Sequence, residues 1–226
     1  MKFAFEYDRP SDAPFVEMVW TTQTIGGGSF ISSASSKLEF VFTKQQDNIT
    51  LSVRGPETLA STAPVPEDAD FLGITFKHGT FIPHLPAADL INGGIHLAQS
   101  NNRTFQLQGS AWEFPTFENI DTFVTRLVRQ GLIAHEPIVE AALKGQLKNI
   151  SERSVQRRFI RATGIPHATI YQIERARKAM ALLKQGHSIL DTVDEAGYSD
   201  QPHLTRSLKH FIGQTPAQIL NTMNDE

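Results

Sequence analysis

The sequence predicts an α+β chain with two domains: a β-rich N-terminal part, and an all-α part in which a long helix joins two helix-turn-helix units. Thirteen of the 15 Phe residues precede Arg126, where the composition changes. Before that point, apolar and polar residues alternate as they do in half-buried strands. After it, residues 151–164 and 199–213 share one pattern: a capping residue, an apolar stripe at helical spacing, and a final Gly.

We expect the chain to divide into residues 1–118, 119–136 and 137–226. The first is a β-rich sensor or dimerisation domain, the second an amphipathic helix with a linker, and the third a helical domain. Residues 1–120 contain 7 Lys/Arg and 13 Asp/Glu, whereas residues 121–226 contain 14 and 11, so the net charge of -3 is the sum of -6 and +3. The basic side chains are therefore concentrated in the helical part, where an acidic partner would bind.

The strands are expected in three regions of the N-terminal part. Residues 14–23 alternate as a strand does, residues 37–42 and 49–55 form a hairpin around a polar turn, and residues 69–81 form a further strand region. The Pro and Ser content of residues 55–66 predicts a loop. The composition thus favours a β-barrel or sandwich.

The helical part begins after an amphipathic helix at residues 117–132, which connects the domains, pairs with a second copy or packs on its own domain. Pro137 at the first position of a helix starts a short supporting helix before the 151–164 segment. Residues 166–186 form the long helix, which is expected to span roughly 30 Å. A short helix with Ile189, Leu190 and Val193 inward, a turn at Gly197 and the helix of residues 199–213 complete the second unit.

The polar edges of the two similar segments have the chemistry of major-groove recognition helices. Arg can form two hydrogen bonds with guanine and Gln two with adenine, while other cations contact phosphate. Successive major-groove faces lie about 34 Å apart, so the long helix could hold both segments on one side of a duplex. The candidate base-contacting residues are Arg153, Gln156, Arg157, Gln201, Thr205 and Arg206, and the candidate phosphate-contacting residues are Arg158, Arg161, His203 and Lys209.

These two motifs together resemble the DNA-binding domain of AraC/XylS transcription regulators. The resemblance implies a sequence-specific transcriptional regulator, an activator, that binds promoter DNA. Val193 departs from the Ala usual in the family but stays apolar. The residues that carry the resemblance are Ser151, Arg153, Gln156, Arg157, Phe159, Gly164, Ala179, Gly197, Tyr198, Asp200, His203, Leu204, Arg206, Lys209, Phe211, Gly213, Thr215 and Pro216.

The N-terminal part resembles, more loosely, the abridged cupin-like domain of short AraC-type regulators, through residues 33–42 and 71–97. The resemblance implies a sensor or dimerisation unit. Two interpretations of its aromatic rings stay open: they line an effector pocket, or they only fill the core. The candidate pocket residues are Trp20, Phe40, Phe42 and Phe76.

An enzyme is the alternative from another class, namely a cupin-like metal enzyme or a small-molecule binding module fused to a DNA-binding tail. His78, His84 and His96 could bind a metal only if the fold brought them together, because no H-x-H occurs. No paired-carboxylate, Ser-His-Asp or phosphate-loop pattern is present. We therefore expect no catalytic residue, metal or cofactor.

The absence of Cys excludes a thiolate metal site and a cysteine nucleophile. With neither a secretory signal nor an apolar run long enough to span a bilayer, we expect a cytoplasmic protein that does not enter a membrane. The expected partners are double-stranded DNA and RNA polymerase. A homodimer and a small-molecule effector are further partners that the sequence leaves open.

Overall fold

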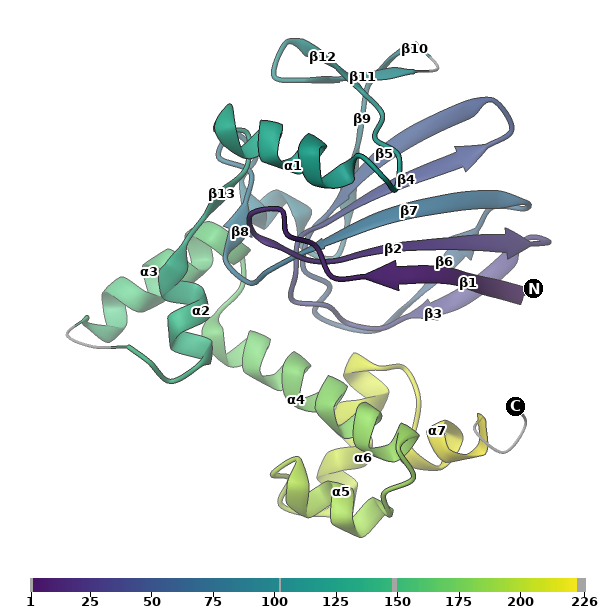
Figure 1. The fold of residues 1–226 in the computed structure, drawn as a ribbon. Coiled ribbons are helices and arrows are strands. Elements are labelled where there is room, and N and C mark those ends of the chain that lie inside the picture. Colours follow the sequence, from purple (N-terminus) through teal and green to yellow (C-terminus); the bar gives the residue numbers. More distant parts are fainter. Residues whose placement is uncertain (1, 102, 148–149, 223–226) are drawn as a thin grey trace. The chain divides into compact units, whose positions relative to one another are not determined.

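We analysed a computed structural model, which describes residues 2–101, 103–147 and 150–222 of the 226-residue chain. The chain forms two compact units. The first contains Met1–Ser29, Lys37–Pro56 and Pro64–Pro166, and the second contains Phe30–Ser36, Glu57–Ala63 and His167–Glu226. Figure 1 shows the β-strands followed along the chain by helices, which confirms the predicted class of a β-rich part and a helical part.

The described strands lie, apart from one, before the first α-helix. They are β1 (Lys2–Arg9), β2 (Val16–Ile25), β3 (Gly28–Ser32), β4 (Glu39–Gln45), β5 (Asn48–Arg54), β6 (Ser61–Val65), β7 (Ala69–Phe76), β8 (Thr80–Phe81), β9 (Gly94–Leu97), β10 (Gln99–Asn101), β11 (Thr104–Leu107), β12 (Ser110–Glu113) and β13 (Ala134–His135). The helices are the 3-10 turn η1 (Ala87–Leu90), then α1 (Ile120–Arg129), α2 (Pro137–Leu143), α3 (Glu152–Thr163), α4 (His167–Lys184), α5 (Ile189–Glu195), α6 (Gln201–Phe211) and α7 (Pro216–Thr222).

A six-stranded antiparallel sheet in the order β1-β2-β7-β4-β5-β9 is the frame of the first unit (Figure 1). The predicted hairpin is confirmed: β4 pairs with β5 from Glu39 opposite Arg54 to Gln45 opposite Asn48. The turn between them has two residues, and Gln46 adopts a φ of 54°. Amide-bearing residues tolerate this left-handed conformation better than β-branched ones do, which fits the polar turn sequence.

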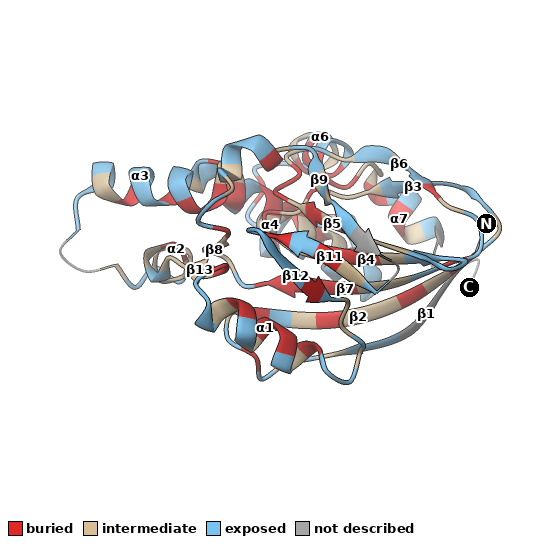
Figure 2. Ribbon diagram, turned by 90° about the horizontal axis from the view of Figure 1, so that it is seen from above, coloured by how far each residue is buried: buried red, intermediate tan, exposed pale blue. Residues whose placement is uncertain are grey.

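One face of this sheet is the main hydrophobic core. The alternation of side chains places Phe40 and Phe42 of β4 on the same face, where Phe76 of β7 also lies buried. Helix α1 and the β10-β11-β12 sheet cover that face: the Phe42 ring centroid lies 6.0 Å from that of Phe123 and 6.4 Å from that of Phe105. Figure 2 shows the buried residues of α1 as one stripe along the helix.

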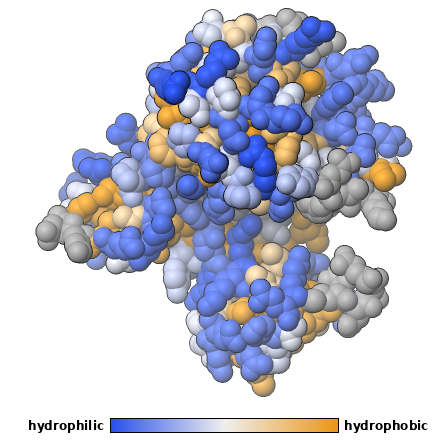
Figure 3. Space-filling view, viewed as in Figure 1, coloured by the Kyte–Doolittle hydropathy of each residue, from blue (hydrophilic) through white to orange (hydrophobic). Residues whose placement is uncertain are grey.

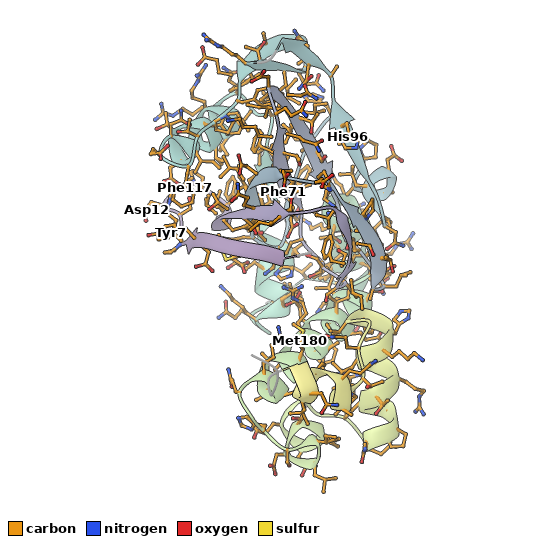
Figure 4. The ribbon with its side chains drawn as sticks, turned by 90° about the vertical axis from the view of Figure 1, so that its right-hand side faces the viewer. Tyr7, Asp12, Phe71, His96, Phe117 and Met180 are labelled. Carbon is orange, nitrogen blue, oxygen red and sulfur yellow. The ribbon has the colours of Figure 1, made fainter. Side chains whose placement is uncertain are left out.

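The amphipathic helix is therefore packed on its own unit, which is one of the interpretations that the sequence left open. Ile120, Phe123, Val124 and Leu127 of α1 are all buried. Near its start, the Phe117 ring meets Tyr7 edge to face with centroids 5.2 Å apart, and both rings lie together in Figure 4. The apolar stripe of α1 thus contributes to the core instead of remaining available for a second copy.

The first unit also contains α2 and α3, which the sequence places in the C-terminal domain. Strand β13 pairs with β8, His135 opposite Thr80, within the segment expected to be a linker. The His135 ring stacks on Phe15 with centroids 4.8 Å apart. At the other end of α3, a Cβ on Gly164 would lie 2.8 Å from the carbonyl oxygen of Ala87, so Gly permits close contact with η1. These contacts place both helices with the β-sheet.

The second unit is built around α4. Its buried residues recur at helical spacing along one side, at Ile170, Ile173, Ala176, Ala179 and Leu183. Helices α5, α6 and α7 pack on α4. At about 1.5 Å per residue, the 18 residues of α4 span roughly 27 Å, close to the expected length.

Two local predictions were wrong. The segment expected as a loop, residues 55–66, contains strand β6, which pairs with β3. Leu190, expected to point inward from α5, is 68% exposed, whereas Val193 is buried as expected and Thr192 is buried beside it. Within the part of the chain that the structure describes, no helix has the length and apolar character needed to cross a membrane.

Candidate nucleic-acid interface

Local sequence signals fix both ends of α3. The Ser151 hydroxyl accepts a hydrogen bond from the amide of Ser154 at 3.4 Å, as a helix N-cap does. Gly164 adopts a φ of 75°, and its amide bonds to the carbonyl of Ile160, as a left-handed C-cap does. The predicted helix of the first motif is therefore confirmed.

The predicted base-contacting residues of α3 lie on its exposed side. Val155 and Phe159 are buried, and Arg157, midway between them in sequence, lies on the opposite side of the helix. Arg153, Gln156 and Arg157 are all exposed. Three long polar side chains with donors for base edges thus share one accessible surface.

Arg158 and Arg161 already have partners within the first unit. The Arg158 guanidinium forms an ion pair with Glu136, with N–O distances of 3.1 and 3.3 Å. The Arg161 guanidinium lies 5.9 Å from the centre of the Phe81 ring. Both side chains are at least partly exposed, so the predicted phosphate contacts would compete with these interactions.

The second motif is α5, a tight turn and α6. Gly197 adopts a φ of 71° in the turn, a conformation that Gly takes with little strain. The next residue, Tyr198, is buried, and the Tyr198 hydroxyl lies 2.9 Å from the Ser207 hydroxyl of α6. This buried pair fastens the turn to the middle of α6.

Asp200 caps the N-terminus of α6. Its Oδ1 accepts a hydrogen bond of 2.7 Å from the amide of His203. That bond is the largest cause that lowers the pKa of the Asp200 carboxyl, with smaller contributions from Ser199 and from the charge of Arg206. The carboxylate therefore stays ionised at neutral pH, where it favours the helix N-terminus.

The outward side of α6 carries the remaining predicted base contacts. Leu204, Ser207, Leu208 and Phe211 are buried. Gln201, Arg206 and Lys209 are exposed and Thr205 is half-buried, and at roughly 100° per residue these four occupy one side of the helix. The structure therefore brings the predicted residues of α6 together, apart from His203.

His203 faces α4 instead, where it contacts Arg175. Arg175 Nη2 lies 3.5 Å from His203 Nε2, and Ser199 Oγ lies 3.1 Å from His203 Nδ1. Because a guanidinium only donates, Nε2 must accept, so Nδ1 carries the proton and donates to Ser199. Both ring nitrogens are thus engaged within the second unit, which leaves neither free for the predicted phosphate contact in this arrangement.

Arg175 is a residue that the sequence analysis missed. Its guanidinium lies 4.3 Å from the centre of the Tyr198 ring, and Nη1 donates to the carbonyl of Gly197 at 3.4 Å. A single Arg of α4 therefore contacts the turn, the following Tyr and the first turn of α6. Nothing in the sequence distinguishes this Arg from its neighbours, because Gly197, Tyr198 and His203 are more than 20 residues away from it.

The four candidate effector-pocket residues do not share one surface. Phe40, Phe42 and Phe76 lie in the core, and the Phe40 and Phe76 ring centroids are 5.2 Å apart. Trp20 lies on the other face of the sheet, opposite Gly73 in the β2–β7 register. Its Nε1 donates to the Thr75 hydroxyl at 3.3 Å.

Of the isolated histidines, His96 contacts the sheet. His96 of β9, labelled in Figure 4, lies with Nδ1 2.9 Å from the Ser52 hydroxyl of β5. Among the described residues, no group of three or more His, Cys, Asp or Glu side chains could hold a metal ion.

The surface of the molecule is mostly hydrophilic in the view of Figure 3, with hydrophobic atoms scattered between charged ones. Large apolar side chains exposed on the described helices include Ile160 of α3, Tyr171 of α4 and Leu190 of α5. Scattered exposed apolar residues are normal on a globular protein.

Comparison with known proteins identifies the helical region. The family model for a helix-turn-helix domain matches residues 147–222. The HTH-type transcriptional regulator RipA of Corynebacterium diphtheriae is 35% identical over 98 residues, which cover 42% of this chain and 28% of the relative. The matched part therefore spans about a quarter of the curated relative.

A solved structure of ToxT from Vibrio cholerae is also similar, with a TM-score of 0.43 and 8% identity over 90% of this chain and 97% of that chain. The helix boundaries, the caps of α3 and α6 and the family match agree on the same region. Residues 147–222 therefore match a helix-turn-helix domain.

Proposed function

We propose that this protein is a sequence-specific transcriptional regulator that binds double-stranded DNA through α3 and α6. The observation that carries the proposal is that each helix buries an apolar stripe and exposes Arg and Gln side chains on the opposite side. Such a surface offers paired donors to base edges in the major groove, which an α-helix can enter.

The proposed roles follow the exposure of the side chains. Arg153, Gln156 and Arg157 contact bases from α3, and Gln201, Thr205 and Arg206 contact bases from α6. Lys209 contacts phosphate, and Arg158 and Arg161 do so after leaving their present partners. Each bidentate base contact contributes roughly 1–3 kcal/mol of discrimination between sequences, whereas phosphate contacts add affinity for any sequence.

The regulatory details are inferred from the AraC resemblance alone. They comprise activation, RNA polymerase as a partner, an effector at the N-terminal part and dimerisation. From composition and helix patterns we also propose the domain boundaries 1–118, 119–136 and 137–226. RipA is a transcriptional regulator by name, and we extend that role to this chain as a proposal. We also propose that the chain is a regulator without catalytic activity.

Selection of bound duplexes from a random pool tests the proposal. We expect a consensus with two parts, and a specific site that binds at least a thousandfold more tightly than bulk DNA at physiological salt. The Arg157→Ala variant should weaken binding to that site by roughly 1–3 kcal/mol and relax the preference at one base position. Arg129→Ala, on α1, removes the same charge outside both motifs and serves as the matched control.

Two results would count against the proposal. If selection enriched no sequence, the chain would lack specific recognition. If Arg157→Ala lowered specific and non-specific affinity by the same factor and reduced the salt dependence, Arg157 would be a phosphate contact instead of a base contact.

A further inference from the structure

Two short segments from the β-rich half of the sequence belong to the second unit. They are Phe30–Ser36 and Glu57–Ala63, here called the capping segments. They are held together by a backbone bridge in which the amides of Ser35 and Glu57 each donate to the other residue's carbonyl, at 3.0 and 2.7 Å. The Ser32 hydroxyl also donates to the Glu57 carboxylate at 2.7 Å.

The capping segments supply hydrogen bonds to the C-terminal end of α6. The last four carbonyls of a helix have no partner within it and must find one elsewhere. The amide of Ala34 donates to the carbonyl of Phe211 at 2.6 Å, and the amide of Ala60 donates to the carbonyl of His210 at 2.8 Å. The amides of Ile212 and Gly213 bond instead to Leu208, one turn earlier. Residues more than 140 positions away thus complete the end of the helix.

Side chains of α4 bind the first capping segment, Phe30–Ser36. Arg177 Nη1 donates to the carbonyl of Ala34 at 3.1 Å, and the Ser36 hydroxyl donates to Glu174 Oε1 at 2.6 Å. Ala34 is fully buried, and both its amide and its carbonyl are used. The backbone of a single residue, Ala34, therefore connects α4 with α6.

Close packing at Gly213 makes this contact specific. A Cβ at that position would lie 2.5 Å from Cγ2 of Ile31 and 3.2 Å from Cβ of Ala60. Gly213 also adopts a φ of 81°, which a residue with a side chain takes only under strain. Both capping segments therefore approach Gly213, the second residue after α6, more closely than a residue with a side chain would allow.

We infer that the capping segments position α6, so that DNA recognition by this helix depends on residues outside the helix-turn-helix domain. The inference rests on the proposed function. The last turn of α6 carries Lys209, a proposed phosphate contact, and helix ends open more readily than helix centres. Because each capping segment continues at both ends into strands of the first unit, the β-rich part is covalently linked to the support of α6.

Hydrogen exchange of the full-length protein without DNA tests the capping role. Ala34→Pro and Ala60→Pro each remove one donor, and we expect roughly two- to tenfold faster exchange of the α6 amides in residues 207–213, from the usual worth of one such bond. Arg177→Ala is the milder variant, because it removes only the contact with the Ala34 carbonyl. Lys184→Ala, an exposed cation on the same helix, is the matched control and should leave this exchange unchanged.

Affinity for the selected DNA site tests the consequence for recognition. We expect the Pro variants to bind roughly two- to fivefold more weakly, because the competent conformation of α6 is less populated. Unchanged exchange in folded variants, judged by circular dichroism, would overturn the inference, as would faster exchange with unchanged affinity. If the wild-type protein selected no DNA, the proposed function would fail, while the exchange data would still report on the capping.

Discussion

Replacing Arg175 tests whether one side chain of α4 holds the second recognition helix in place. Arg175 contacts the Tyr198 ring at 4.3 Å, the carbonyl of Gly197 at 3.4 Å and Nε2 of His203 at 3.5 Å. The Nε atom of Arg175 is buried and has no hydrogen-bond partner among the described residues. Removing this atom therefore breaks no further hydrogen bond. The Arg175→Ala variant removes all three contacts, and Arg175→Lys keeps the charge without the planar fork.

The expected loss follows from these contacts. A partly buried cation over an aromatic ring stabilises by about 1 kcal/mol. The two hydrogen bonds are long, so each contributes about 0.5 kcal/mol, at the low end of the usual range. Arg175→Ala should therefore lower the free energy of unfolding of the second unit by roughly 2 kcal/mol. Arg175→Lys should lose about half as much, because an ammonium can keep the ring contact but cannot reach all three partners.

Hydrogen exchange of the α6 amides measures this loss, because the free energy of opening can be read for the second unit alone. The order of protection should be wild type, then Arg175→Lys, then Arg175→Ala. Lys184→Ala serves again as the control. Equal losses for the two Arg175 variants would mean that the charge alone stabilises nothing and that the planar guanidinium accounts for the whole effect. A loss below about 0.5 kcal/mol for Arg175→Ala would refute the positioning role.

Three further substitutions have defined outcomes. Ser151→Ala should destabilise α3 by about 1 kcal/mol, measured by urea denaturation, whereas Ser151→Asp keeps an N-cap acceptor and should restore most of it. Gly73→Ala should lower the melting temperature, because the added Cβ would lie 1.9 Å from the Trp20 indole, and overpacking costs about 1–3 kcal/mol. Burial lowers the pKa of His135 against the opposing effect of Glu140, so the unfolded chain binds more protons just below about pH 6.5, and stability should fall there as the pH drops. His135→Gln should flatten that part of the profile of melting temperature against pH, and an unchanged profile would show that other groups cause it.

The helices were predictable because their signals are local. Ser151 and Gly164 bound α3 through hydrogen bonds to residues three or four positions away. Asp200 marks the start of α6 in the same way, and the buried stripe of α4 repeats at the period of the helix. An apolar stripe with a capping residue at each end predicts a helix from a single stretch of sequence.

The features that the sequence could not predict depend on distant partners. Strand β6 lies in a segment rich in Pro and Ser, and it pairs with β3, which is separated from it by 28 residues along the chain. Trp20 has apolar neighbours in sequence, but the register opposite Gly73 places it away from the Phe core. The exposed positions of the predicted residues in α3 and α6 could be predicted from helical periodicity. The roles of Arg175 and of the capping amides could not be predicted. Backbone amides have no sequence signature, and the partners of Arg175 lie in the turn before α6 and in α6 itself.

The placement of the two Trp residues separates the parts of this protein spectroscopically. Trp20 and Trp112 both belong to the first unit, and the helical unit around α4 has only Tyr as a fluorophore. Emission excited at the red edge of the indole absorption therefore reports on the β-rich part alone. A denaturant titration that gave different midpoints by fluorescence and by far-ultraviolet circular dichroism would reveal helices that melt independently of the sheet.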